Sequence, residues 1–279
     1  MKFMAWLGYY LPFLYEWGMV PCGDVGDGYL WFDHGAGGRN MNGLDPDMPE
    51  GTYEDRIRRQ SDLGANWTCL FSSNGGDGQY SQGSPMSIYK GNVVGGEVDD
   101  GMVKMMKKRI RYARRKGLTV TLCLHSDDDK AGLNNKGAPQ DTHHRDVVNR
   151  FDKYVCSYWL ILEPQDSGWN RQYIADRVTV LKGMTNKPIG LHDYPRSVDR
   201  IAGLGADHAY VQYWHPQEVA RHSAAEMTAQ TASFRSRIGG MKLHATEWGT
   251  YVKEWHAHIK ALAKAAKGAG AFGSGSGVP

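Results

Sequence analysis

From residue 53 onward the chain alternates between segments typical of helices and short apolar segments typical of buried strands. The strand-like run at residues 118–124 is almost continuous in β-branched residues and leucine, as strands covered on both faces require. Glycines such as Gly117 and Gly183 close the helix-like segments. No antiparallel hairpin signal interrupts the alternation. The pattern therefore predicts a parallel sheet with helices packed outside it.

The number of units favours a closed barrel of class α/β. Eight strand–helix units fit a barrel better than an open doubly wound sheet, and no Gly-x-Gly-x-x-Gly fingerprint follows the first strand. Residues 11–52, with many glycines and prolines, are interpreted as a long first βα loop, and no linker divides the chain. We therefore predict a single (β/α)8 (TIM) barrel domain over residues 1–279. Its expected strands are 3–10, 66–71, 118–124, 158–163, 188–193, 209–214, 241–247 and 269–273.

Composition and charge exclude several other classes. A length of 279 residues suits one barrel, and 41% hydrophobic with 23% charged residues is typical of a globular protein. The formal net charge of +3 is too even for a nucleic-acid partner. The basic run at 107–116 is interpreted as the wet side of an amphipathic helix. No run approaches the roughly 20 apolar residues of a transmembrane helix, so no membrane partner is predicted.

The cysteines and the start of the chain leave the location open. Three of the four cysteines lie within or beside apolar runs, which predicts buried thiols, although a disulfide remains an alternative. The apolar stretch up to Tyr15 follows one positive charge but has no small-x-small cleavage site. It is interpreted as the first strand rather than as a signal peptide. These features leave open whether the protein acts outside the cell.

Polar and aromatic residues follow directly after five successive predicted strands. Because function in a (β/α)8 barrel collects where the carboxyl ends of the strands converge, we expect these residues around one mouth. They are His125-Ser126-Asp127, Glu163-Pro164, His192-Asp193-Tyr194, Tyr213-Trp214-His215 and Glu247-Trp248-Gly249.

Glu163 and Glu247 are the candidate catalytic pair. Glu163 shares strand parity with Trp159 and Ile161, and Glu247 shares it with Leu243 and Ala245. Each glutamate is therefore expected to point with the inner set of its strand. Carboxyl groups about 5–5.5 Å apart suit a retaining glycosidase, and about 6.5–9.5 Å suits an inverting one. The chemistry needs one carboxyl protonated and the other ionised. The alternative is that each glutamate pairs with a basic side chain at the rim.

Two segments resemble a known superfamily. Tyr158-Trp-Leu-Ile-Leu-Glu163-Pro164 and Lys242-Leu-His-Ala-Thr-Glu247-Trp-Gly249 are similar to the strand-4 and strand-7 motifs of the retaining (β/α)8 glycoside hydrolases. That superfamily includes cellulases, β-mannanases and xylanases, and the resemblance covers most of the chain from about residue 53. It implies Glu163 as acid/base and Glu247 as nucleophile. It also implies that His192 and Tyr194 line the site, and that Tyr213 hydrogen-bonds the nucleophile or the substrate.

Three positions depart from the superfamily pattern. Leu162 stands where an asparagine usually precedes the acid/base, and Phe272 stands where a tryptophan commonly closes strand 8. The arginine often found near strand 2 has no equivalent in Ser72-Ser73-Asn74. These departures indicate a divergent member with an unusual substrate, or one that has lost activity.

The βα loops also supply residues expected to bind carbohydrate. Flat aromatic faces in such loops can pack on the apolar CH surface of a sugar ring. Together with the strand-5 and strand-6 residues above, we predict His125, Trp169, Trp214 and Trp248 as substrate-binding residues. His143-His144, at a helix start, is expected to be exposed. His125 with Asp127–Asp129 is an alternative divalent-cation site, but a solvated acidic loop is the preferred interpretation.

The sequence thus predicts an endo-acting, retaining glycoside hydrolase that acts on a poly- or oligosaccharide. It needs no metal ion and no cofactor, its partner is the carbohydrate substrate, and it is a monomer or weak oligomer. Two alternatives remain. Leu162 favours a carbohydrate-binding barrel without catalysis. A metal-dependent barrel hydrolase would use His192, His215 and His244 with Asp127–Asp129, but residues 1–10 lack the paired histidines that such a site wants.

Overall fold

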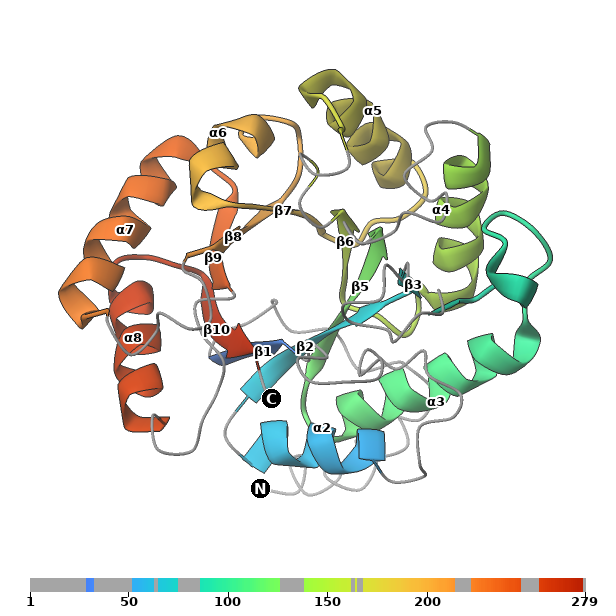
Figure 1. Ribbon diagram of the computed structural model, residues 1–279, viewed down its shortest axis with the longest axis horizontal. Coiled ribbons are helices and arrows are strands. Elements are labelled where there is room, and N and C mark those ends of the chain that lie inside the picture. The colour runs from blue at the N-terminus through green and yellow to red at the C-terminus, as the bar shows by residue number, and fades with distance from the viewer. Residues whose placement is uncertain are drawn as a thin grey trace, which may run out of the picture.

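The computed structural model describes residues 29–32, 52–62, 65–74, 86–125, 138–161, 164, 168–213, 222–246 and 256–277. Their strands pair in parallel in the order β1-β10-β9-β8-β7-β6-β5-β2, and β1 also pairs with β2, which closes the sheet on itself (Figure 1). An α/β fold with a parallel sheet, as predicted, is confirmed. The strands are β1 (Tyr29–Phe32), β2 (Ala65–Phe71), β5 (Thr119–His125), β6 (Ser157–Ile161), β7 (Ile189–Asp193), β8 (His208–Gln212), β9 (Lys242–Thr246) and β10 (Gly273–Gly277).

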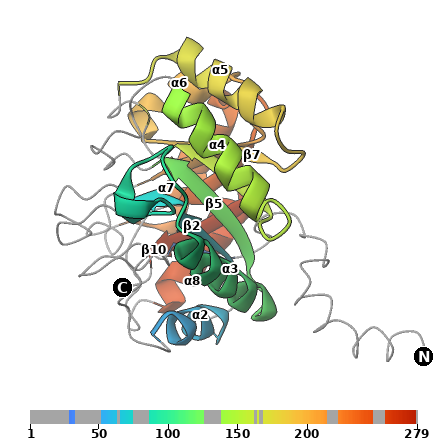
Figure 2. The ribbon, with the colours of Figure 1, turned by 90° about the vertical axis from the view of Figure 1, so that its right-hand side faces the viewer.

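Helices connect successive strands and lie outside the sheet, with α3, α4 and α5 on the side that faces the viewer in Figure 2. Side-chain caps define several of their starts. Asp99 accepts hydrogen bonds from the N–H groups of Gly101 and Met102, and Ser223 with Glu226 forms a capping box. The helices are α2 (Thr52–Asp62), α3 (Asp100–Arg115), α4 (Ala138–Phe151), α5 (Arg171–Lys182), α6 (Val198–Ile201), α7 (Ala224–Arg237) and α8 (His256–Gly268).

A small excursion separates β2 from α3. It contains the antiparallel strands β3 (Ser73–Asn74) and β4 (Met86–Ser87) and the 3-10 turn η1 (Lys90–Asn92). Tyr89, between β4 and η1, is almost fully buried and brings its hydroxyl to α4. The excursion therefore packs beside the carboxyl end of β5.

Large aromatic rings fill the middle of the barrel. Trp67 of β2 stacks on Tyr210 of β8 with ring centroids 5.8 Å apart, and Trp159 of β6 lies 4.7 Å from the same tyrosine. Because these strands are far apart in the ring, the three side chains meet at its centre. The Trp67 indole N–H donates to Oγ1 of Thr121, 2.7 Å away. Gly190 of β7 leaves room for this packing, since a Cβ there would lie 2.2 Å from the Tyr210 ring.

The first and last strands differ from the prediction. Residues 3–10, predicted as the first strand, lie outside the described residues, and the position between β10 and β2 is taken by β1. The predicted loop 11–52 is therefore wrong at Tyr29–Phe32. The last strand is Gly273–Gly277 rather than 269–273, with the sequence Gly-Ser-Gly-Ser-Gly. Glycine has poor strand propensity, so backbone pairing with β1 and β9 decides this strand.

The cysteines of the described residues differ in their state. Cys69 and Cys123 are buried thiols, as predicted, whereas Cys156, just before β6, is disulfide-bonded. Within the described part of the chain no helix has the length and apolarity to cross a bilayer.

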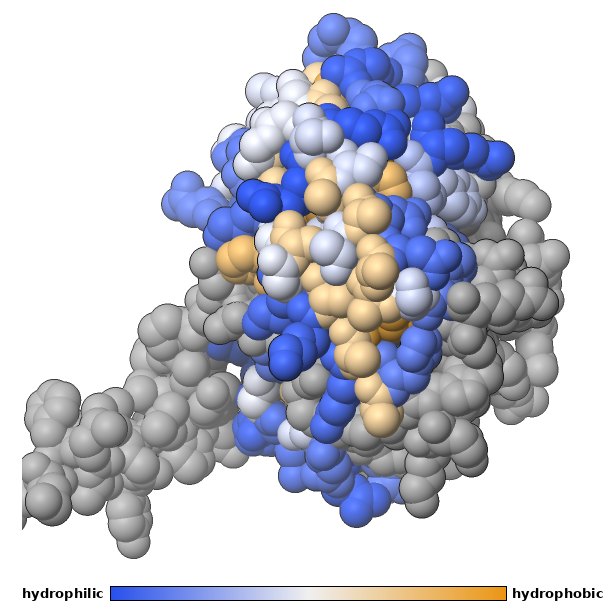
Figure 3. Space-filling view, turned by 90° about the vertical axis from the view of Figure 1, so that its left-hand side faces the viewer, coloured by the Kyte–Doolittle hydropathy of each residue, from blue (hydrophilic) through white to orange (hydrophobic). Residues whose placement is uncertain are grey.

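The face formed by α7 and α8 shows a band of small apolar side chains between hydrophilic ones, and exposed alanines such as Ala225 and Ala261 belong to these helices (Figure 3).

Candidate active site

Strand β6 presents its tryptophan to the barrel interior and its tyrosine to the helices. Trp159 contacts the central rings, whereas the Tyr158 hydroxyl donates to Asp152 just after α4, 3.2 Å away. By alternation Ile161 belongs to the same inner set as Trp159. Trp159 and Ile161, with which the sequence analysis grouped Glu163, are therefore the inner set of β6. Glu163 itself lies outside the described residues.

Strand β9 has the opposite parity from the one predicted. His244 stacks on Tyr210 with centroids 4.4 Å apart, so His244 faces the interior. Alternation then turns Leu243 and Ala245 toward the helices. Grouping Glu247 with Leu243 and Ala245 as an inner set was wrong. Glu247 also lies outside the described residues; it follows the last residue of β9.

His125 ends β5 and is paired with a histidine that the sequence interpretation left outside the site. Its Nε2 lies 2.6 Å from Nε2 of His144 on α4, and both side chains are buried. Burial lowers the pKa of His144 to about 3 and takes the pKa of His125 well below its ordinary value. Both imidazoles are therefore neutral, and the Nε2–H of one donates a hydrogen bond to Nε2 of the other. The expectation that His143-His144 is exposed was wrong.

His143 joins this pair to the excursion after β2. Its Nε2 lies 3.0 Å from the Leu124 carbonyl oxygen, and its Nδ1 lies 3.2 Å from the Tyr89 hydroxyl. Burial lowers the pKa of His143 to about 4, so its Nε2–H donates to the carbonyl. The same hydroxyl is 3.1 Å from the Asp146 carboxylate, and burial beside that charge raises the pKa of Tyr89. These contacts fix the start of α4 against the end of β5.

Trp169 lies against His125 from the other side. The two rings meet edge to face at 5.4 Å, and Trp169 makes a second such contact with Tyr173 at 4.9 Å. Only 4% of Trp169 is exposed, so its ring offers no open face to a sugar in this structure. Trp169, which was predicted to pack on a sugar ring, instead packs against His125.

Two of the predicted site residues lie at the end of β7. His192 is buried, and its ring meets Trp159 edge to face at 5.0 Å. Tyr194 is half-buried, with the Arg196 guanidinium 5.5 Å from its ring centroid. Both lie at the carboxyl end of β7, as predicted.

Tyr213 packs against α7 on the outer side of the sheet. Its hydroxyl donates to Oγ1 of Thr231 on α7, 3.0 Å away, and its ring packs against Phe234. The side chain follows the outer set of β8, because Tyr210 marks the inner one. That burial raises the pKa of the Tyr213 hydroxyl. Trp214 and Trp248, the other predicted sugar contacts, lie outside the described residues.

The described part of the site surrounds the carboxyl ends of β5, β6 and β7. Buried rings converge there from β5, β7 and α4, namely those of His125, His192 and His144, and they form a wall of low dielectric constant at the end of β6. Among the described residues, no group of three or more His, Cys, Asp or Glu side chains could hold a metal ion. His215 and Asp127–Asp129, invoked for the metal alternative, are outside the described residues.

Comparison with known proteins identifies the fold. No protein-family model matches the chain, and no curated protein matches it. A β-glucosidase from Thermotoga maritima in complex with castanospermine is 12% identical, with 90% of this chain and 88% of that chain covered and a TM-score of 0.62. A glycoside hydrolase family 5 mannosidase from Rhizomucor miehei is 14% identical, with coverages of 93% and 85% and a TM-score of 0.59.

A protein from Bacteroides vulgatus named as a candidate glycoside hydrolase has a TM-score of 0.65 at 12% identity. Here 93% of this chain matches 55% of that protein, so the chain spans about half of its length. The chain therefore shares its fold with these proteins, which confirms the resemblance drawn from the two strand motifs at the level of the fold.

Proposed function

We propose that the chain is a retaining glycoside hydrolase that cleaves O-glycosidic bonds within a poly- or oligosaccharide. Residues 1–279 would form one catalytic (β/α)8 domain, with Glu163 as acid/base and Glu247 as nucleophile. The observation that carries the proposal is the inner set of β6. Trp159 and Ile161 face the barrel axis, and Glu163 follows two residues later at the end where barrel enzymes place their catalysts.

The mechanism uses the two carboxyl groups in turn. Glu163 protonates the leaving oxygen while the Glu247 carboxylate attacks the anomeric carbon, which gives a glycosyl–enzyme intermediate. Glu163 then takes a proton from water as the water displaces Glu247. The buried rings of His125 and His192 support this assignment. A low-dielectric surrounding favours a protonated carboxyl, as an acid/base requires.

The test is release of reducing ends from a polysaccharide panel by the wild type, Glu163→Gln and Glu247→Gln. We expect the wild type to act on at least one polymer and each variant to lose activity by about 10³-fold or more. Glu97→Gln, an exposed carboxylate on the excursion, is the matched control and should keep full activity. Equal activity in all four proteins would make both glutamates structural. The anomeric configuration of the first product, read by NMR, decides between retention and inversion.

A second candidate is a carbohydrate-binding barrel without catalysis. Leu162 in place of the usual asparagine favours it, and so does Tyr213, whose hydroxyl is engaged by Thr231 on the outer side. Sugar binding without release of reducing ends over long incubation would support this function. For a metal-dependent hydrolase, loss of activity with a chelator is the corresponding sign.

The remaining expectations are parts of the same proposal. The partner is the carbohydrate alone, and the protein acts as a monomer or weak oligomer without nucleic acid, membrane or cofactor. A location outside the reducing cytosol is supported by the disulfide at Cys156, since structural disulfides persist in oxidising compartments.

A further inference from the structure

The outer wall of the barrel carries a row of basic side chains that the proposed function does not use. α3 buries Val103, Met106, Ile110 and Ala113, as expected of an amphipathic helix. On its opposite side, positions three, four, seven and eleven residues after Lys104 share one stripe with that lysine, and all of them are basic. Together with one lysine from the turn after α4 they form the basic face: Lys104, Lys107, Lys108, Arg111, Arg115 and Lys153.

Three members of the basic face meet around a single aromatic ring. The cationic groups of Lys107, Arg111 and Lys153 lie 5.6, 5.9 and 5.1 Å from the centroid of the Tyr154 ring. Because they share this ring, the three charges occupy one patch of the surface, formed by α3 and the turn after α4. A ring contact at an exposed site contributes about 0.5–1 kcal/mol and holds the cation in place, but it does not neutralise the charge.

Among the residues that the structure describes, no carboxylate forms an ion pair with the basic face. The acidic side chains close to Lys153 in sequence have other partners. Asp152 accepts a hydrogen bond from the Tyr158 hydroxyl at 3.2 Å, and the Asp146 carboxylate lies 2.8 Å from the Arg150 guanidinium. Like charges gathered on one patch repel one another, so a bound anion would stabilise this arrangement.

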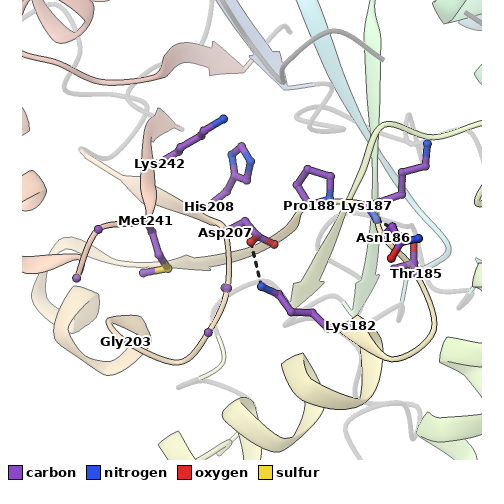
Figure 4. Close-up of a pocket in the computed structure, with 14 residues that line it drawn as sticks. Lys182, Thr185, Asn186, Lys187, Pro188, Gly203, Asp207, His208, Met241 and Lys242 are labelled. Atoms are coloured by element: carbon purple, nitrogen blue, oxygen red, sulfur yellow. Dashed lines mark hydrogen bonds and ion pairs between the residues drawn. The ribbon is translucent and has the colours of Figure 1, made fainter. Parts of the chain in front are cut away.

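The lysines at the amino ends of β7–β9 differ in this respect. A cleft of about 830 Å³ there is lined by Lys182, Lys187 and Lys242 together with Asp207 (Figure 4). The Lys182 ammonium lies 2.9 Å from the Asp207 carboxylate, and the Lys242 ammonium lies 4.3 Å from the centroid of the Phe272 ring. The cleft thus compensates part of its positive charge with its own carboxylate, whereas the basic face does not.

The direction of α3 suits a long ligand. The helix follows the excursion after β2, at the carboxyl ends of the strands, and ends just before β5 begins; Figure 2 shows it on the outside of the barrel. The stripe from Lys104 to Arg115 therefore extends for roughly 16 Å along the barrel wall, from near the mouth toward the amino ends of the strands. A straight row of charges fits a linear polymer with repeated anionic groups better than a compact ion.

We propose that the basic face binds an acidic polysaccharide, a glycan chain whose sugars carry carboxylate or sulfate groups. The choice of a polysaccharide rests on the proposed function, since a chain held along α3 would lead to the mouth at which cleavage is proposed. Lysine and arginine form charge-assisted hydrogen bonds with such groups, and these are stronger than hydrogen bonds between neutral groups.

Two other polyanions fit the basic face less well. Amphipathic helices enter a bilayer surface through apolar side chains, and those of α3 are buried in the core. A single-stranded nucleic acid stacks its bases on aromatic faces, and cations already lie over the Tyr154 and Tyr112 rings. An acidic glycan needs only the charges.

The test is binding of the full-length protein to dextran sulfate, polygalacturonate and neutral dextran. We expect binding to at least one acidic polymer and none to dextran, with affinity at least about tenfold lower in about 500 mM than in about 50 mM NaCl, because salt screens exposed charges. The variant Lys107→Gln/Arg111→Gln/Lys153→Gln should bind about tenfold more weakly or worse. The matched control Lys260→Gln/Lys264→Gln/Lys267→Gln removes as many exposed charges from α8 and should bind as the wild type does.

Each contrary result has a defined meaning. No binding to either acidic polymer at low salt overturns the proposal. Equal weakening in the two triple variants means that only net charge matters, which overturns the assignment to α3. Tighter binding to duplex DNA or to phosphatidylglycerol vesicles, lost in the same variant, overturns the choice of a polysaccharide. If that variant does not fold, Lys104→Gln/Lys108→Gln, which removes two exposed lysines without a ring contact, repeats the test.

The two acidic polymers distinguish sulfate from carboxylate as the recognised group. None of these readouts uses hydrolysis, so failure of the proposed glycosidase activity and failure of this inference are separate results. Where an acidic polymer is also the substrate, the variant at the basic face should raise KM and leave kcat unchanged, because it removes binding remote from the reacting bond.

Discussion

At the carboxyl end of β5 the polar side chains are buried and neutral, whereas the charged side chains at the amino ends of β7–β9 reach water. The first group includes His125 and His144, whose pKa values burial lowers below the ordinary range. The second includes Lys182 and Asp207, each with 41% of its side chain exposed. The first group is thus tied to the core and the second to the solvent. Changes at the first end should alter folding, and changes at the second should alter it little.

The aromatic rings between the two ends keep them apart, and removing one should have the largest effect. Trp159→Ala deletes a fully buried ring that contacts Trp67, Tyr210 and His192. We expect a loss of about 3–5 kcal/mol in the free energy of unfolding, measured with denaturant. Lys187→Ala at the cleft should change it by less than about 0.5 kcal/mol. Similar losses for both variants would contradict the contrast between the ends.

The tight packing around Tyr210 can be tested at Gly190 of β7. Gly190→Ala places a Cβ 2.2 Å from the Tyr210 ring, an overlap that the packed interior cannot relieve without moving the ring. We expect a cost of about 3 kcal/mol in unfolding free energy. Gly268→Ala, at the end of α8, has no atom within 4 Å of the new Cβ and serves as the control. The two variants should unfold at clearly different denaturant concentrations.

The neutral histidines make stability depend on pH. His143 and His144 have pKa values near 4 and 3 in the folded protein, below the ordinary 6.5. Between pH 6.5 and about 4 the unfolded chain binds protons that the folded chain does not. Stability is therefore full above pH 6.5 and falls as the pH drops, by about 1.4 kcal/mol per pH unit for each such histidine.

Denaturant unfolding of the wild type and His144→Gln at pH 7 and 5.5 checks this dependence. The variant should lose less stability on acidification than the wild type does, because one proton uptake has been removed. Parallel pH dependence in the two proteins would mean that His144 is solvated and not buried.

Variants at the charged amino ends of β7–β9 should give the smallest change in the free energy of unfolding. Lys182→Ala removes an exposed ion pair with Asp207 and should lower the unfolding free energy by about 0.2–1 kcal/mol, less at high salt. Asp207→Ala should cost more, because its second oxygen also accepts the N–H of Ile189. A larger loss for Lys182→Ala than for Asp207→Ala would show that the lysine packs rather than pairs.

The sequence predicted the positions of the strands that have long apolar runs, and it failed to predict the positions of the strands that lack them. β2, β5, β6, β7, β8 and β9 fall within a few residues of their predicted ranges, because buried parallel strands need continuous apolar sequence. β1 is only four residues long, and β10 is glycine and serine, so neither carries that signal. Their existence depends on pairing with neighbours that are distant in sequence.

The same reasoning explains the error on β9. Helices cover the outside of the sheet, so Leu243 and Ala245 are buried there, while the interior accepts His244 beside the central rings. Apolar character does not distinguish the two faces of such a strand. Likewise His125 was found from its position at a strand end, but His144 required the packing of α4 and could not be read from spacing.

Strand β10 also determines when the sheet can close. It pairs with β9 on one side and with β1, the first strand of the ring, on the other. On the ribosome, both of those neighbours would emerge earlier and present unpaired edges, which invite pairing with other chains. The nascent protein would depend on protection from aggregation until residues 273–277 leave the exit tunnel.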